Sequence, residues 1–296
     1  MIQAVSTSAM PATSVERSVE CMSTAMSSSS VAPAGRTVLV TGASSGLGLA
    51  TADHLNLAGW TVVGTSRRGT GHGFASAVMD VDDDASVRDG VAAVVAEHGR
   101  LDAVVACAGW GLAGAVETTP IDRAKAQLET NFWGVVRVVQ AALPVMRASG
   151  GGRVVLMSSI GGEIGIPFQA FYSASKFAME GYAEAFAYEV APFGIDVTLV
   201  QPGNFRTGFT AARDNITSPG DPYAAAAAKA VALMIRDEEG GADPRKVAEL
   251  VAKVLSAKRP PRRVSVGNFD ERAGMIAKRL MPHRWFEKAA KSSLGV

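Results

Sequence analysis

Four polar residues of this chain have the types and the order needed to move a proton onto an oxygen atom. Tyr172 and Lys176 lie four residues apart in a helical pattern, so the phenol and the ammonium share one helix face. Ser159 precedes Tyr172 by 13 residues and follows an apolar strand, and Asn131 lies within a longer helical stretch. These four residues are the candidate catalytic group.

The chemistry that they suit is the reduction of a ketone by hydride, in which negative charge develops on the oxygen. A free phenol has a pKa of about 10, and the Lys176 ammonium is expected to lower the pKa of Tyr172 toward neutrality. The Ser159 hydroxyl can donate a hydrogen bond to the oxygen that becomes charged. Ser158 is the neighbouring alternative, but the 13-residue separation from Tyr172 favours Ser159.

A glycine-rich loop joins the first expected strand to the first expected helix and reads Thr41-Gly42-Ala43-Ser44-Ser45-Gly46-Leu47-Gly48. Gly42 permits a tight turn, Gly46 lets the backbone approach a pyrophosphate, and Gly48 allows close contact between helix and strand. Free N–H groups at the start of the helix would face the phosphates. The loop therefore predicts a dinucleotide site, with contacts from Gly42, Ser44, Ser45, Gly46, Leu47 and Gly48.

The G-x-x-x-G-x-G spacing of this loop, with the order Asn131, Ser159, Tyr172 and Lys176, resembles the short-chain dehydrogenase/reductase family. The resemblance covers about residues 36–266 and implies a nicotinamide cofactor that serves a carbonyl–alcohol interconversion. It also implies that Lys176 bonds the nicotinamide ribose. Asn131 would hold a water molecule that relays protons from Lys176 to solvent.

The same resemblance implies further contacts with the cofactor. Asp80 and Val81 would bond the adenine, and Ala108 and Gly109 would lie against a ribose. Cys107 stands where the family has Asn, which weakens the expected support of the sheet at that point. The remaining implied contacts come from Tyr172 and Lys176 and from the segment after the sixth expected strand, at Pro202, Gly203, Phe205 and Thr207.

The end of the second expected strand bears on the choice between NAD and NADP. Chains that bind NAD carry an acidic residue near this point, which bonds the ribose 2′-hydroxyl. Here Ser66 is followed by Arg67 and Arg68, and a guanidinium suits a 2′-phosphate. NADP(H) is therefore the predicted cofactor, with Arg67 as its phosphate contact. The alternative is an NAD-specific enzyme in which both arginines are solvated loop charges.

Short β-branched runs alternate with long Ala-rich stretches from Arg36 onward, and strands such as 152–158 are apolar on both faces. This pattern predicts an α/β fold: a doubly wound, Rossmann-like three-layer sandwich with a seven-stranded parallel sheet. The expected strands are 37–41, 60–66, 75–80, 101–107, 152–158, 195–201 and 262–266. The expected helices are 46–58, 84–98, 121–148, 169–192, 223–236, 244–257 and 270–290.

Residues 34–296 are expected to form a single domain, in which about 204–240 covers the site as a substrate lid. Its expected hinge points are Gly208, Pro219-Gly220 and Gly240-Gly241. Residues 1–33 are rich in Ser and show no period, which predicts a disordered tail. A translation start placed too early, with Met22 or Met26 as the true start, is the other interpretation.

Composition excludes several other classes of protein. The 29 basic and 28 acidic residues nearly cancel, so no global field recruits nucleic acid. No apolar run approaches the ~20 residues that a bilayer span needs. The two cysteines fit neither a disulfide framework nor a metal-ligand spacing, so no metal site is expected and the reducing cytoplasm is the expected compartment.

The C-terminal region is strongly basic, because residues 253–296 hold 11 Lys or Arg and 3 acids. Apolar residues recur over 275–286, so this end could lie on an anionic membrane. The other interpretation, which is preferred, is a helix that packs on its own domain with a solvated basic face.

The predicted function is NADPH-dependent reduction of a hydrophobic ketone, or the reverse oxidation of a secondary alcohol, with Tyr172 as the general acid or base. The lid and the C-terminus resemble those of family members that act on steroids, retinoids or other large ketones. Two alternative functions stay open: an isomerase or epimerase on the same fold, and a non-catalytic NADP-binding module.

A homodimer or homotetramer is expected through helices 121–148 and 169–192. The apolar pocket walls are expected at Trp110, Ile164, Ile166, Phe168, Phe171, Phe209 and Tyr223.

Overall fold

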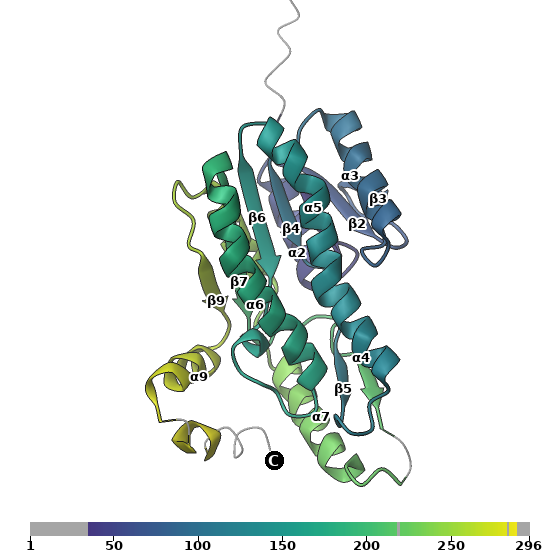
Figure 1. Cartoon of the computed structure of the whole chain (residues 1–296), viewed down its shortest axis with the longest axis vertical. Coiled ribbons are helices and arrows are strands. Elements are labelled where there is room, and N and C mark those ends of the chain that lie inside the picture. The colour runs from purple at the N-terminus through teal and green to yellow at the C-terminus, as the bar shows by residue number, and fades with distance from the viewer. Residues whose placement is uncertain (1–34, 218–219, 283, 289–296) are drawn as a thin grey trace, which may run out of the picture. The chain divides into compact units, whose positions relative to one another are not determined.

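The computed structural model describes residues 35–217, 220–282 and 284–288, so the expected tail at 1–33 lies outside the described residues. Seven strands form one parallel sheet in the order β3-β2-β1-β4-β6-β7-β9, with helices on both faces (Figure 1). The strands are β1 (Thr37–Thr41), β2 (Thr61–Ser66), β3 (Ala75–Val78), β4 (Ala103–Ala106), β6 (Gly152–Met157), β7 (Ile195–Pro202) and β9 (Arg263–Val266).

The central strands are apolar on both faces because helices cover both faces. Every residue of β1 and β4 is buried, and most of these residues are Val, Leu or Ala. The principal helices are α2 (Gly46–Leu57), α3 (Asp84–His98), α4 (Ile121–Leu128), α5 (Gly134–Ala148), α6 (Ala170–Val190), α7 (Ala224–Glu239), α8 (Arg245–Ser256) and α9 (Phe269–Leu280).

The two sides of the sheet hold separate hydrophobic clusters. Helices α3, α5 and α6 cover the face that is in front in Figure 1, and their apolar residues pack on Leu39, Val104 and Leu156. Helices α2 and α8 cover the opposite face, where they pack on Val38 and Val155. The structure is thus the predicted three-layer, doubly wound sandwich.

The sequence predicted these seven strands to within about three residues at each end, but the chain also contains a second, smaller sheet. In it β5 (Leu112–Gly114) pairs in parallel with β8 (Asp214–Ile216). Each of these strands has only three residues, so neither shows a recognisable period. Their pairing joins the segment after β4 to the expected lid.

Two of the expected helices differ in the structure. The stretch 121–148 is interrupted by a π-helical turn at Glu129–Trp133, between α4 and α5. The stretch 270–290 is not continuous either, because α9 ends at Leu280 and Met281 takes an extended conformation. Pro282 explains this end, since proline disfavours a helical conformation in the residue before it. Helical structure resumes at 284–288.

The order of the strands fixes where a ligand can bind. The chain moves outward from β1 to β2 and β3, then returns to β4 on the other side of β1. In open sheets of this kind the loops diverge at such a reversal and leave a crevice at the carboxyl ends of the strands. The glycine-rich loop follows β1 at this crevice.

Candidate active site

Most of the sequence-predicted site residues follow the carboxyl ends of the strands and therefore share one edge of the sheet. The remainder lie on α6 and on the turn between α4 and α5, which reach the same edge. By strand, the groups are Gly42–Gly48 after β1, Arg67 after β2, Asp80 and Val81 after β3, Ala108 and Gly109 after β4, Ser159 after β6, and Pro202–Thr207 at and after β7.

The glycine-rich loop is shaped as a cradle. Gly42 and Gly46 have φ angles of 67° and 57°, in the left-handed region that favours glycine. A β-carbon on Gly48 would lie 2.3 Å from the Gly42 carbonyl oxygen, so only glycine lets α2 start this close to β1. Ser45 caps α2 without a side-chain hydrogen bond. The N–H groups of the first turn of α2 can therefore bind an anion.

Thr207 lies across the loop, because a β-carbon on Gly46 would be 3.6 Å from the Thr207 β-carbon. The segment after β7 thus approaches the start of α2 and narrows the crevice. This placement agrees with the expectation that Thr207 contacts the cofactor, which stays a prediction. Phe205 is buried and forms a bridge with Ala242, so its backbone position is fixed.

The segment Cys107–Gly109 is held by a group that the sequence interpretation did not consider. The Thr41 hydroxyl accepts hydrogen bonds from the backbone N–H groups of Cys107 at 3.1 Å and Ala108 at 3.2 Å. The threonine of β1 thereby supports the place where the family has Asn. Burial raises the pKa of the Cys107 thiol to about 12, so the thiol stays protonated near neutral pH.

Arg67 is exposed at the end of β2, beside the glycine loop, because Thr65 of β2 pairs with Thr41 of β1. Within the described residues, Arg67 has no ion pair. The Ser66 hydroxyl donates to the Gly69 carbonyl at 2.6 Å and accepts from Arg68 N–H, which shapes the turn. Asp80 is half-buried, and its carboxylate accepts from the N–H of Asp82. The arrangement leaves Arg67 able to meet a phosphate on the adenosine side.

Tyr172 and Ser159 meet at the edge of the crevice. Both are buried, and a β-carbon on Gly161 would lie 3.2 Å from Tyr172 Cε1 and 3.4 Å from Ser159 Oγ. Burial raises the pKa of the Tyr172 phenol above its usual value, while a hydrogen bond with Ser159 opposes this shift. Ser158 points elsewhere, since its hydroxyl donates to Glu180 at 2.6 Å. Of the two serines, the structure places Ser159 beside Tyr172.

Lys176 is buried one turn after Tyr172. Its ammonium donates to the Met157 carbonyl at 2.8 Å and lies 5.8 Å from the centre of the Tyr172 ring. Burial lowers the pKa of Lys176 to about 8. The sequence predicts that Lys176 brings the pKa of Tyr172 below its usual value. This prediction is wrong, because among the groups of the protein itself the burial of the phenol has the larger effect. Desolvation is the largest influence on the phenol, and its pKa rises.

The low pKa of Lys176 predicts that part of the free energy of unfolding depends on pH. The variant Lys176→Met should lack this pH-dependent part. Lys176 has a pKa of about 8 when folded and 10.5 in its ordinary state, so between these values the unfolded chain binds more protons. Stability contributed by this site therefore rises with pH across that window. The difference in unfolding free energy, wild type minus variant, should increase by about 2 kcal/mol from pH 7 to pH 10. Urea unfolding at both pH values measures it, and an equal difference at both would contradict the burial of a charged ammonium.

Asn131 is fully buried in the π-helical turn. Its amide oxygen accepts from the Trp110 N–H and its amide nitrogen donates to the Trp110 carbonyl, both at 3.0 Å. The amide nitrogen also reaches Ser175 Oγ on α6 at 3.3 Å. Asn131 thus joins the segment after β4 to the helix that carries Tyr172 and Lys176. The water-holding role implied by the resemblance remains a prediction.

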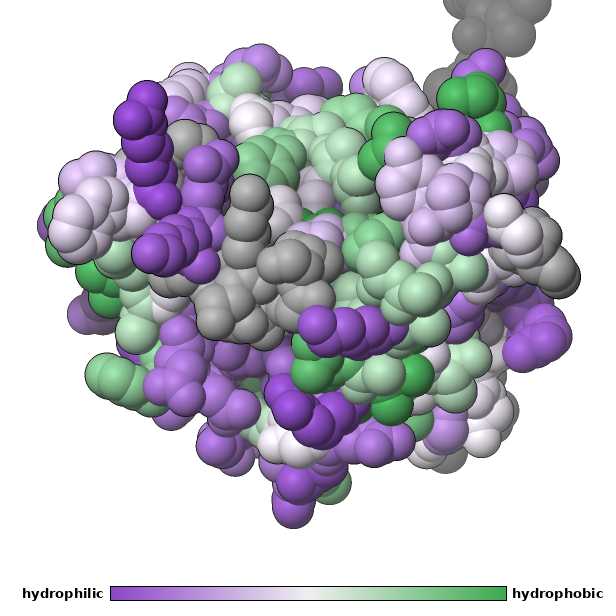
Figure 2. Space-filling model, turned by 90° about the horizontal axis from the view of Figure 1, so that it is seen from below, coloured by the Kyte–Doolittle hydropathy of each residue, from purple (hydrophilic) through white to green (hydrophobic). Residues whose placement is uncertain are grey.

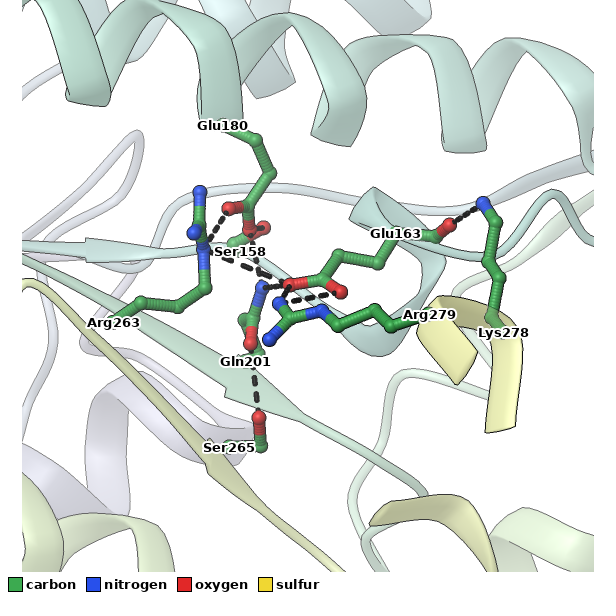
Figure 3. A network of polar contacts seen from close by, with 8 residues as sticks. All are labelled: Ser158, Glu163, Glu180, Gln201, Arg263, Ser265, Lys278 and Arg279. Atoms are coloured by element: carbon green, nitrogen blue, oxygen red, sulfur yellow. Dashed lines mark hydrogen bonds and ion pairs between the residues drawn. The ribbon is translucent and has the colours of Figure 1, made fainter. Parts of the chain in front are cut away.

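A polar network behind Ser159 holds several elements together, and sequence reasoning missed it. Figure 3 shows the Gln201 amide between the carboxylates of Glu163 and Glu180, at 2.8 and 3.0 Å. Arg263 of β9 donates to Glu180 at 2.7 Å. Glu180 lies on the α6 face that carries Tyr172 and Lys176, at i+8 and i+4, so that spacing was the available signal.

Helix α9 is bound to the rest of the domain by charged residues. Arg279 pairs with the Glu163 carboxylate at 2.7 Å, Lys278 donates to the Glu163 carbonyl, and Met275 is buried. The expected helix packed on its own domain is therefore present. Its apolar surface is only partly used, since Ile276 and Leu280 are exposed.

The expected lid is anchored at both ends by backbone pairing. At these ends the Ala242 N–H donates to the Asn204 carbonyl at 3.0 Å, and the Arg206 N–H donates to the Ala242 carbonyl at 3.1 Å. Within the lid, β8 pairs with β5. The expected hinge at Gly240-Gly241 would have to break these contacts, and a β-carbon on Gly241 would lie 2.6 Å from the Asn204 oxygen. Pro219 lies outside the described residues, whereas Gly208 has open space around it.

The residues expected to form the pocket walls lie in different places in the structure, and only some of them lie beside Tyr172. Phe209 lies beside Tyr172, with ring centres 5.9 Å apart, and Ile166 lies beside the Gly161 position that contacts Tyr172. Ile164 lies near Gly274 of α9 instead. Trp110 and Phe171 are half-buried.

An open groove of about 520 Å³ lies beyond β5 and has a mostly apolar lining: Ala115, Val116, Glu117, Pro167, Phe168 and Tyr223. Phe168 has a φ angle of 59°, a costly conformation for an aromatic residue, and its carbonyl accepts from Gly114 N–H at 2.8 Å.

Figure 2 shows the molecule from below, at the end toward which β6 runs in Figure 1. Hydrophobic residues gather on this surface, and hydrophilic residues surround them. This end of the molecule can receive an apolar ligand. Among the described residues, no helix is both long and apolar enough to cross a bilayer.

The crevice can hold a dinucleotide, and a buried phenol, ammonium and serine hydroxyl lie at its edge. A parallel doubly wound sheet with this arrangement defines a nucleotide-dependent oxidoreductase. The chain belongs to the short-chain dehydrogenase family, whose model matches residues 36–216.

Relatives and solved structures agree with this membership. The chain is 44% identical over 234 residues to a 3-ketodihydrosphingosine reductase of Bacteroides thetaiotaomicron, covering 78% of this chain and 87% of that protein. It is 35% identical over 257 residues to retinol dehydrogenase 8 of Bos taurus, covering 79% and 82%. A short-chain dehydrogenase structure from Streptomyces avermitilis matches with a TM-score of 0.75 and 32% identity, covering 88% and 99%.

Proposed function

We propose that the protein catalyses the NADPH-dependent reduction of a ketone on a long-chain, hydrophobic small molecule. The observation that carries this proposal is the meeting of Tyr172, Ser159 and the buried Lys176 at the edge of the glycine-loop crevice. The apolar groove beyond β5 supports a hydrophobic substrate. The similarity to a 3-ketodihydrosphingosine reductase favours a long-chain 3-ketone.

The residues present fit the cofactor. The cradle of Gly42, Gly46 and Gly48 would take the pyrophosphate on the start of α2, and Arg67 would take the 2′-phosphate. Further contacts would come from Asp80, Val81, Ala108, Gly109, Lys176 and Thr207. When bound, NADPH supplies the hydride that reaches the carbonyl carbon.

Side chains of the protein stabilise and protonate the carbonyl oxygen of the substrate. Ser159 donates a hydrogen bond to the carbonyl oxygen and so stabilises the negative charge that develops there. Tyr172 gives its proton to the same oxygen, and the product is the neutral alcohol. Because burial raises the pKa of Tyr172, the phenol holds its proton near neutral pH and is ready to act as an acid. Lys176, whose ammonium lies 5.8 Å from the centre of the Tyr172 ring, would take part in returning a proton to the phenolate.

A panel of ketones tests the proposal, with NADPH consumption followed by the nicotinamide absorbance. Long-chain 3-ketones should be reduced, whereas a ketose sugar of similar carbonyl reactivity should not. If no ketone consumes NADPH although NADPH binds, the enzymatic function is wrong and the non-catalytic rival is favoured. Oligomeric assembly through α5 and α6 stays a prediction, and light scattering on the purified chain measures it.

A further inference from the structure

The Ser158 hydroxyl joins the end of β6 to α6. It donates to Glu180 Oε1 at 2.6 Å, and Glu180 is only 7% exposed. The Ser158 N–H donates to the Val200 carbonyl of β7 at 2.8 Å. A β-carbon on Gly162 would lie 2.8 Å from Ser158 Oγ and 3.1 Å from Glu180 Cγ, so the turn after β6 packs directly on the helix. Ser158 is therefore held both by the sheet and by α6.

The carboxylate of Glu180 is itself fixed by partners from two other strands. Gln201 of β7 donates to Glu180 Oε1 at 3.0 Å, and Arg263 of β9 donates to Oε2 at 2.7 Å (Figure 3). The orientation of the Gln201 amide is fixed too, because its oxygen accepts from Ser265 at 2.9 Å and its nitrogen also donates to Glu163. A fully satisfied buried network of this kind is rigid. Glu180 thus offers its oxygen from one fixed position.

The direction of the Ser159 side chain depends on that of Ser158. The backbone at Ser159 is extended, with φ −165° and ψ 163°, and along an extended backbone successive side chains point to opposite sides. The Ser158 side chain is directed at Glu180, so the Ser159 side chain leaves the backbone on the other side. There its hydroxyl accepts from the Gly161 N–H at 3.0 Å and hydrogen-bonds with Tyr172. A rotation of this segment that releases Ser158 would also turn Ser159 away from Tyr172.

Glu180 could also act on the site through its charge. It lies one turn after Lys176 on α6, and it opposes the effect of burial, which is the largest influence on the pKa of Lys176. Arg263 already neutralises the Glu180 carboxylate at close range, so the pair acts on Lys176 as a dipole and not as a full charge. The hydrogen bond to Ser158 is therefore the stronger connection between Glu180 and the reacting groups.

We propose that Glu180 is a positioning residue of the reduction, which accepts from Ser158 and so keeps the Ser159 hydroxyl aimed at the carbonyl oxygen. This inference rests on the proposed function and deepens it, because it names the group that holds the donor in place. A donor stabilises the developing charge only if it is already aimed at the oxygen before the reaction starts. A displacement of about 1 Å can lower a rate by ~10²-fold.

Ser158→Ala and Glu180→Met each remove this hydrogen bond. On the whole chain, each should lower the single-turnover rate of ketone reduction roughly 10-fold and change the Kd for NADPH by less than about twofold. Glu180→Gln is the conservative variant, because its amide oxygen can still accept from Ser158, and its rate should stay within about threefold of the wild type. Glu184→Met is the matched control, since Glu184 is exposed one turn further along α6, and it should keep the wild-type rate.

A double-mutant cycle separates positioning from a general loss of structure. Ser159→Ala removes the hydroxyl that is positioned, so the addition of Ser158→Ala should lower the rate no further. An equal loss with and without Ser159 would overturn the proposal. Ser158→Ala deletes a single hydroxyl and is the variant least able to disturb folding, so a wild-type rate in it would overturn the proposal and leave the proposed function standing.

Two further outcomes decide the remaining alternatives. A Glu180→Gln variant as slow as Glu180→Met would overturn the proposal, because the charge of Glu180 and not its hydrogen bond to Ser158 would then carry the effect. If the wild type reduces no ketone although NADPH binds, the proposed function fails and this inference fails with it.

Discussion

Phenylalanine in place of Tyr172 is expected to lower kcat for ketone reduction roughly 10³-fold, within the range for loss of a positioned general acid. The phenyl ring keeps the contact with Phe209 and the position beside Gly161, so only the proton donor is lost. The Kd for NADPH should change by no more than about tenfold, the value of one neutral hydrogen bond. Single-turnover kinetics and fluorescence titration with NADPH measure the two quantities.

Tyr182 provides the control on the same helix. It stacks on Phe186, and burial raises the pKa of its phenol to about 12, but it has no lysine four residues later. Tyr182→Phe should therefore retain the wild-type kcat. If Tyr172→Phe also retained it, the proton would come from another group and the proposed mechanism would be wrong.

The second large effect is expected at the end of β2, where Ser66→Asp combined with Arg67→Ala should reverse the cofactor preference. Removal of the guanidinium takes away a charge-assisted contact with the 2′-phosphate, and the new carboxylate repels that phosphate while it can bond a 2′-hydroxyl. The ratio of kcat/KM for NADPH to kcat/KM for NADH should fall about 10³-fold, or about 4 kcal/mol. An aspartate at position 66 can still accept from the Arg68 N–H, so the turn keeps that bond.

NADH serves as the internal control for this experiment. Arg67→Ala alone should weaken NADPH use and leave kcat/KM for NADH unchanged, because NADH has no 2′-phosphate. An NADPH preference that survives Arg67→Ala would show that Arg67 is not the phosphate contact. The NAD-specific alternative would instead be favoured by a wild type that uses NADH better.

The sheet and the residues along its edge could be predicted from the sequence because each depends on a local pattern. Buried parallel strands are continuous apolar runs, and the glycine spacing and the Tyr172–Lys176 pair lie within single turns of the chain. Parallel topology then brings residues from six strand ends together without further information.

Other parts depend on contacts between distant residues and had no local signal. β5 and β8 are three residues each and form only because they pair across about a hundred residues. The ion pair of Arg213 with Glu238 joins the start of β8 to the end of α7, and either residue alone reads as a surface charge. The direction of the Tyr172 pKa shift was predicted wrongly because charge proximity was considered and burial was not.

Glu271 connects α9 to the segment that follows β7. Its carboxylate accepts from Asn204 N–H at 2.7 Å and from Asn268 N–H at 2.7 Å, and Asn204 lies three residues before Thr207. A displacement of α9 would therefore strain the turn that faces the glycine loop. The position of α9 and the conformation of the turn before Thr207 are therefore mechanically linked through one carboxylate.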